Sequence, residues 1–226
     1  MTLSAWLAVA CDVDGIMWYP WEFGGLLEWM DESRGSIQPT ERYYAARKAG
    51  QAIQRIAPIL DSLEFVRTYA SRAFEHDYPY PRNEATRLDT LASHCYWHGQ
   101  DFRALYRVQS FTPSGAGWSP APETHSFAQI SRFRSPSVSL HDHTREDYWF
   151  LVVNRRALPT ERRKIRLSIE TDSALRNQSY AVDYILGDST RILEPDASHV
   201  YSSDTRVFDV ILDPGDAELI HFYRKE

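Results

Sequence analysis

From Glu64 onward, short runs rich in β-branched and aromatic residues recur between turn-forming residues. This pattern restricts the possible folds more than any other feature of the sequence. Apolar and polar residues alternate in two of the runs, Ile165–Ile169 and Val207–Val210, and a turn signal such as Asp213–Asp216 separates others. Strands of this length and spacing are typical of an antiparallel β-sandwich with polar outer faces. The predicted strands are 65–74, 125–133, 148–154, 164–170, 180–186, 207–212 and 217–223.

The first 63 residues follow a different pattern. Trp6–Ala10 predicts a short helix, and Gly15–Tyr19 is an apolar run without alternation, which is typical of a parallel strand covered on both faces. Pro39 fits the first position of a second helix, and Pro58 is expected to end or kink that helix near position 56. Apolar or small residues mark one face of this helix at positions 45, 49, 53, 56 and 60.

A parallel strand needs hydrogen-bonding neighbours on both sides, and nothing upstream of Gly15–Tyr19 supplies them. We therefore expect the chain to be a piece of a larger protein. The predicted fold class is α+β: residues 1–63 form a remnant β–loop–α unit, and residues 64–226 form an antiparallel β-sandwich. The range 75–124 is rich in Pro, Tyr and Arg, and it is expected to be an irregular insertion in the second domain.

Four motifs, in this order, resemble the carboxyl-terminal part of a (β/α)8-barrel glycoside hydrolase. Ala8–Glu22 is similar to the last barrel strand and the aromatic loop after it, and Ile56–Leu60 is similar to the turn that ends the next helix. Tyr148–Arg155 and Pro214–Leu219 are similar to two strands of the β-domain that follows the barrel. The closest likeness is to the retaining clan that includes β-galactosidase-like and agarase-like enzymes.

The resemblance covers roughly residues 5–70 and 145–223, and it implies that residues 1–63 are the last strand and helix of a truncated barrel. Enzymes of this clan use two carboxylates, about 5 Å apart for retention, which follow the fourth and seventh barrel strands. A chain that begins at the eighth strand lacks both, so no catalytic residue is expected here and the chain alone is expected to be inactive. Barrel active sites lie at the C-terminal ends of the strands, and indole faces stack on sugar rings. The residues expected to contact substrate are Trp18, Tyr19, Trp21 and Glu22.

The expected function is therefore that of a C-terminal fragment of a carbohydrate-active enzyme whose partner is an oligosaccharide or polysaccharide. One alternative is a non-catalytic carbohydrate-binding β-sandwich, in which Trp97, Trp118 or Trp149 would line one exposed face. The apolar strand around Trp149 favours a core position for that residue. A second alternative is a structural domain that mediates subunit contacts.

Composition narrows the range of partners. The net charge is −6 and no dense basic run occurs, so nucleic acid is not expected to bind. No window approaches the ~20 apolar residues of a bilayer span. The histidine-containing segments 94–98 and 141–143 lack the four-ligand spacing of a structural zinc site, so neither a metal nor another cofactor is expected. An apolar amino-terminal edge without barrel neighbours predicts self-association of the isolated chain.

Overall fold

The computed structural model describes residues 2–13, 16, 27–29, 37–71, 88–90, 105–121, 127–137, 147–171, 177–194 and 205–225. Most of this part of the chain is antiparallel β-sheet, with two helices. The elements, in chain order, are α1 (Thr2–Val9), β1 (Leu27–Trp29), β2 (Ile37–Pro39), α2 (Glu41–Leu60), β3 (Glu64–Ser71), β4 (Leu88–Thr90), β5 (Leu105–Ser114), β6 (Gly117–Pro120), β7 (Ala128–Arg134), β8 (Asp147–Asn154), β9 (Arg163–Glu170), β10 (Tyr180–Tyr184), β11 (Ser189–Leu193), β12 (Thr205–Leu212) and β13 (Ala217–Arg224).

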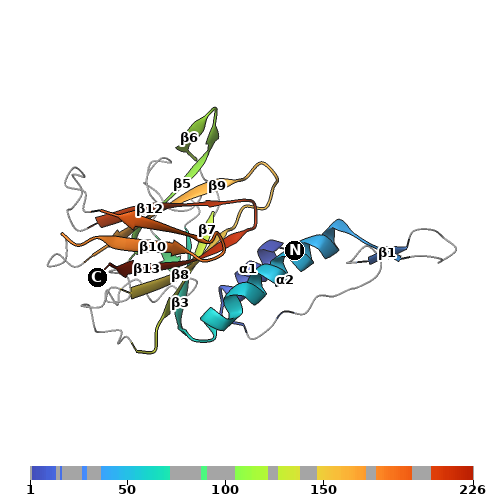
Figure 1. The fold of residues 1–226 in the computed structure, drawn as a ribbon. Coiled ribbons are helices and arrows are strands. Elements are labelled where there is room, and N and C mark those ends of the chain that lie inside the picture. Colours follow the sequence, from blue (N-terminus) through green and yellow to red (C-terminus); the bar gives the residue numbers. More distant parts are fainter. Residues whose placement is uncertain are drawn as a thin grey trace.

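Two larger sheets pack face to face (Figure 1). The first has seven strands in the order β11-β10-β13-β8-β7-β3-β4, and the second has four in the order β12-β9-β5-β6. Strands β1 and β2 pair separately and lie beyond the amino-terminal end of α2. The antiparallel β-sandwich of the predicted α+β fold is confirmed, and each of the seven predicted strands overlaps an observed one. The barrel remnant predicted for residues 1–63 is not confirmed.

The core between the two sheets follows from the alternation of side chains along each strand. On β13, Ile220 and Phe222 point into the space between the sheets and are fully buried there. Ala217 and Leu219 of the same strand point to the opposite face of the seven-stranded sheet, and they are buried too. One face of this sheet is therefore covered by the second sheet, and part of the other face is covered by other elements of the chain.

The cover on that other face is the helix pair (Figure 1). Trp6 of α1 is 2% exposed, and with Ile56 of α2 it belongs to a cluster that we call the helix-side cluster. Its remaining buried members are Val9, Ala10, Phe133, Leu151, Val153, Ala217 and Leu219. The helices and the sandwich thus share a continuous apolar interface. Neither helix in the described part of the chain is long and apolar enough to cross a membrane.

The second helix differs from the prediction at both ends. Thr40, not Pro39, precedes its first residue, and the Thr40 Oγ1 atom accepts a hydrogen bond from the Tyr43 N–H at 3.4 Å. A threonine oxygen can cap the free N–H groups of a first turn, so it sets this boundary. Pro58 lies inside the helix, which continues to Leu60. The last turn closes nevertheless, because the N–H of Asp61 donates to a carbonyl one turn earlier.

Strands also form in the range for which the sequence predicted an irregular insertion. β5 pairs with β9 from Leu105 to Phe111, and the tight turn at Gly115 leads into β6. Val108 on β5 is fully buried between the sheets. The described part of the range 75–124 therefore contains two of the four strands of the smaller sheet.

Candidate functional site

The residues predicted to contact substrate, Trp18, Tyr19, Trp21 and Glu22, lie outside the described residues, so their role stays a prediction. The same holds for the strand predicted at Gly15–Tyr19, of which only Ile16 is described. Ile16 is not in a strand, and it packs partly against the helix-side cluster. The histidine-containing segments and Trp97 also lie outside the described residues.

Within the described residues, aromatic and acidic side chains gather on the seven-stranded sheet, on the face that carries the helices. Trp149 of β8 and His221 of β13 are direct cross-strand neighbours, and their rings stack with centroids 4.0 Å apart and planes 8° apart. The ring of Tyr223, on the same strand as His221, stacks on the His221 ring with centroids 4.5 Å apart. We call these three residues, with Asp147 and Asp183, the Trp149 cluster.

The two carboxylates flank the histidine. One Asp147 oxygen lies 2.8 Å from His221 Nε2, and one Asp183 oxygen lies 3.9 Å from His221 Nδ1. Thr190 Oγ1 donates a hydrogen bond of 2.6 Å to Asp183. Burial raises the pKa of the Tyr223 hydroxyl, and the Asp183 carboxylate, which accepts its hydrogen bond, raises that pKa further. The carboxylates are therefore fixed in place by hydrogen bonds and remain partly exposed, at 33% for Asp147 and 26% for Asp183.

Strand alternation and register build this cluster. Thr190, Asp183, His221 and Trp149 lie opposite one another on β11, β10, β13 and β8, so they form one row across the sheet. The sequence favoured a core position for Trp149, but its side chain is only half-buried. Leu151 and Val153 on the same face of β8 are fully buried in the helix-side cluster, whereas Trp149 packs at its margin.

A second half-buried group of aromatic residues lies on the outer face of the smaller sheet. The Lys164 amino group lies 4.6 Å from the Phe111 ring centroid and 5.7 Å from the Trp118 centroid. Arg166 also lies over Phe111, at 4.9 Å, and makes a two-pronged ion pair with Asp209. These rings already hold cations of the protein itself, so this group has less unoccupied aromatic surface to offer a ligand.

The Trp149 cluster combines the two features that sugar recognition uses. Aromatic rings offer an apolar surface to the C–H face of a sugar ring, and carboxylates accept hydrogen bonds from sugar hydroxyl groups. No group of three or more potential metal ligands occurs among the residues the structure describes. Comparison of the chain with protein-family models, curated proteins and solved structures found no match.

Sequence reasoning singled out Trp149 but missed Asp147, Asp183, His221 and Tyr223. One signal was present: positions 147 and 149 share a face of one strand, and 221 and 223 share a face of another. That signal does not say which strands are neighbours. The pairing of β8 with β13, two segments far apart in the chain, brings the rings together.

Proposed function

We propose that this chain is the carboxyl-terminal part of a carbohydrate-active glycoside hydrolase, to which it contributes aromatic substrate contacts and an accessory β-sandwich. The catalytic carboxylates belong to a part of the enzyme outside this chain, and the substrate is an oligosaccharide or polysaccharide. One observation carries the proposal. The four motifs on which the resemblance rests, far apart in the sequence, all contribute side chains to the helix-side cluster.

The first motif, Ala8–Glu22, contributes Val9 and Ala10, and the second, Ile56–Leu60, contributes Ile56. The two β-domain motifs contribute buried residues from neighbouring strands, namely Leu151, Val153, Ala217 and Leu219. Motifs that meet in one interface are expected to be retained together, because each supplies part of the other's packing surface. The convergence supports a β-domain that holds the last helices of a barrel.

The turn before β13 supports the same interpretation. Gly215 has a φ of 72°, and a Cβ atom built there would lie 3.1 Å from the Leu3 side chain. Glycine permits both the backbone conformation and the close approach of α1. Close by, Lys48 Nζ on α2 makes a 2.8 Å ion pair with Asp216. Both helices therefore contact the turn with which the fourth motif begins.

Polar contacts fasten the end of α1 to the sheet. Ser131 Oγ on β7, which is fully buried, donates a 2.5 Å hydrogen bond to the Ala10 carbonyl. Gln129 Nε2 on the same strand donates to the Leu7 carbonyl at 3.4 Å. Carbonyl groups in the last turn of a helix have no partner within the helix, so these bonds satisfy groups that burial would otherwise penalise. The sandwich thus holds the end of α1 from which the chain continues toward Trp18.

The test is binding and turnover by the full chain of 226 residues, with a panel of neutral galacto-, agaro- and cello-oligosaccharides. We expect binding of at least one member, hydrolysis of none, and affinity about tenfold weaker in Trp21→Ala. Trp118→Ala is the matched control, because this indole lies on the smaller sheet, and it should leave the affinity unchanged. Hydrolysis by the chain itself would refute the proposal. So would the absence of binding to every oligosaccharide of the panel and to every polysaccharide tested.

A second candidate function is a non-catalytic carbohydrate-binding module, and the Trp149 cluster is the observation that favours it. In that case Trp149→Ala weakens oligosaccharide binding and Trp21→Ala does not. The opposite result assigns the affinity to the aromatic residues after α1. An upstream reading frame that encodes further β–α units and two strand-end glutamates would separate the two candidates independently of binding.

A further inference from the structure

A cavity of about 300 Å³ lies where the two helices meet one end of the sandwich. Its walls come from α1, α2, the β10–β11 turn and the adjoining ends of β12 and β13. We call it the junction pocket. Its volume is at the lower end of the range for small-molecule sites, which suits a ligand the size of one sugar ring. The pocket is separate from the Trp149 cluster, none of whose residues line it.

The most unusual wall residue is Glu218, a carboxylate that is only 8% exposed. Its Oε1 atom accepts a hydrogen bond of 2.6 Å from the Leu186 N–H, and its Oε2 atom accepts one of 3.0 Å from the Gly187 N–H. A Cβ atom at position 187 would lie 3.1 Å from Oε2, so glycine allows this approach. A carboxylate oxygen accepts more than one hydrogen bond, so Glu218 retains acceptor capacity toward a ligand.

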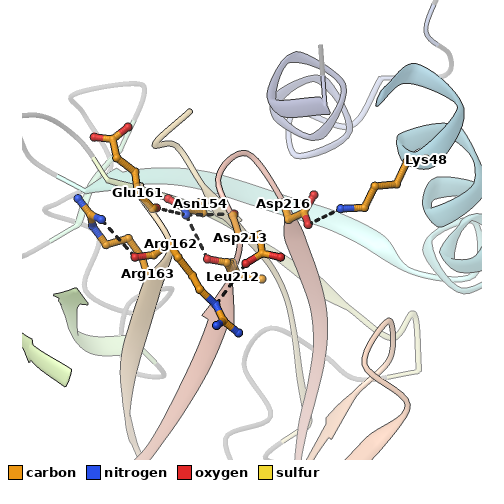
Figure 2. A network of polar contacts seen from close by, with 8 residues as sticks. All are labelled: Lys48, Asn154, Glu161, Arg162, Arg163, Leu212, Asp213 and Asp216. Carbon is orange, nitrogen blue, oxygen red and sulfur yellow. Dashed lines mark hydrogen bonds and ion pairs between the residues drawn. The ribbon is translucent and has the colours of Figure 1, made fainter. Parts of the chain in front are cut away.

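Four of the remaining charges of the pocket form two ion pairs. Figure 2 shows Asp216 pointing toward Lys48, 2.8 Å from its amino group, and Arg162 reaching Asp213 at 3.2 Å. With Arg55 and Glu218, the walls carry three cations and three carboxylates, so their formal charges cancel. A pocket whose formal charges cancel has no excess of either sign to attract an ion, but it offers both donors and acceptors.

Other lining residues are apolar. Trp6, which is 2% exposed, lines the pocket with the small side chain of Ala52 on α2, and Ile211 adds a half-exposed branched side chain. Such surface packs against the C–H groups of a sugar ring, while the ring's hydroxyl groups both donate and accept hydrogen bonds. We propose that the junction pocket binds a single neutral hexose unit, with Glu218 as hydrogen-bond acceptor and the Trp6 side as the apolar wall. The inference rests on the proposed function for its class of ligand.

The test uses amide NMR of the full chain titrated with D-galactose. Leu186 and Gly187 are the reporters, because their N–H groups donate to the carboxylate that the sugar would share. We expect a saturable shift of both amides, with a Kd in the range of about 1–10 mM. D-galacturonate and D-galactosamine carry one charge each on the same ring, and we expect both to bind more weakly than the neutral sugar.

Ala52→Leu adds three carbon atoms to the wall of the pocket and keeps Glu218, and we expect it to raise the Kd about tenfold or more. Ala45→Leu is the matched control, since it adds the same atoms to a half-buried alanine of α2 outside the pocket. If circular dichroism shows that Ala52→Leu does not fold, Ile211→Trp replaces it, because Ile211 is 49% exposed at the rim. No saturable shift up to about 100 mM, equal affinity in the filled variant, or tighter binding of a charged analogue overturns the inference.

The outcomes separate this inference from the proposed function. A chain that binds oligosaccharides but gives no shift at Gly187 refutes the hexose pocket alone. A chain that gives the shift but fails to bind any oligosaccharide or polysaccharide refutes the proposed function alone.

Discussion

Asn154, the last residue of β8, provides the sharpest test of how the sandwich is held together. Its side chain is fully buried, and its amide nitrogen donates to the carbonyls of Glu161 at 3.0 Å and Asp213 at 3.1 Å, with a longer contact of 3.4 Å to the Leu212 carbonyl. Its amide oxygen accepts the Arg156 N–H at 3.0 Å. One side chain therefore joins the end of β8 to the loop before β9 and to the end of β12 (Figure 2).

Asn154→Ala removes the partner of three well-formed hydrogen bonds and leaves a small cavity. At about 1 kcal/mol for each bond, with a similar cost for the cavity, the free energy of unfolding should fall by about 3–4 kcal/mol. Urea titration followed by fluorescence measures this loss, which should appear as a lower midpoint with an unchanged slope. Asn177→Ala makes the same chemical change at an exposed turn and should cost less than about 0.5 kcal/mol. A loss below about 1 kcal/mol in Asn154→Ala would refute this account of the buried network.

Two further predictions concern the helix layer and the junction pocket. Trp6→Ala should cost about 3–5 kcal/mol in urea unfolding, because it empties the centre of the helix-side cluster, and a loss under about 1 kcal/mol would mean that the helices do not dock as described. Burial raises the pKa of Glu218, although N–H groups at Leu186 and Gly187 lower it in part, so the folded chain binds this proton more tightly than the unfolded chain. The stability that Glu218 contributes is then fully present below its unfolded pKa and is lost as pH rises through the folded pKa. The free energy of unfolding of the wild type minus that of Glu218→Gln should be larger at about pH 4 than at about pH 7, and the opposite slope would contradict the shift.

The sequence predicted seven of the strands from Glu64 onward, because alternation and turn chemistry were both present, as in Ile165–Ile169 and at Gly215. It missed the short strands β4 and β11, and also β5 and β6, where Pro113, Gly115 and Pro120 are typical of loops. What makes β5 a strand is its pairing with β9, a segment about sixty residues further along the chain, and such pairing overrides local propensity.

The helices show the same division between local and distant causes. The apolar face of α2 was readable from its spacing, but its first residue depended on the Thr40 cap rather than on Pro39. The candidate site was even harder to predict from the sequence, because the Trp149 cluster depends on the strand order β10-β13-β8. Sequence alone gives the side of each strand on which a residue lies, but not the neighbouring strand.

The helix-side face of β8 carries both the packing surface for the helices and the Trp149 ring. Leu151 and Val153 are fully buried beneath the helices, whereas Trp149 and Asp147, on the same face of the same strand, remain half-buried beyond the main contacts. Because a strand is stiff over this length, the helices that pack on Leu151 also fix the position of Trp149 relative to α1. Any saccharide that contacts the Trp149 ring is thereby held at a defined place with respect to α1. Such a fixed position suits both candidate functions, and the Trp149→Ala and Trp21→Ala variants separate them.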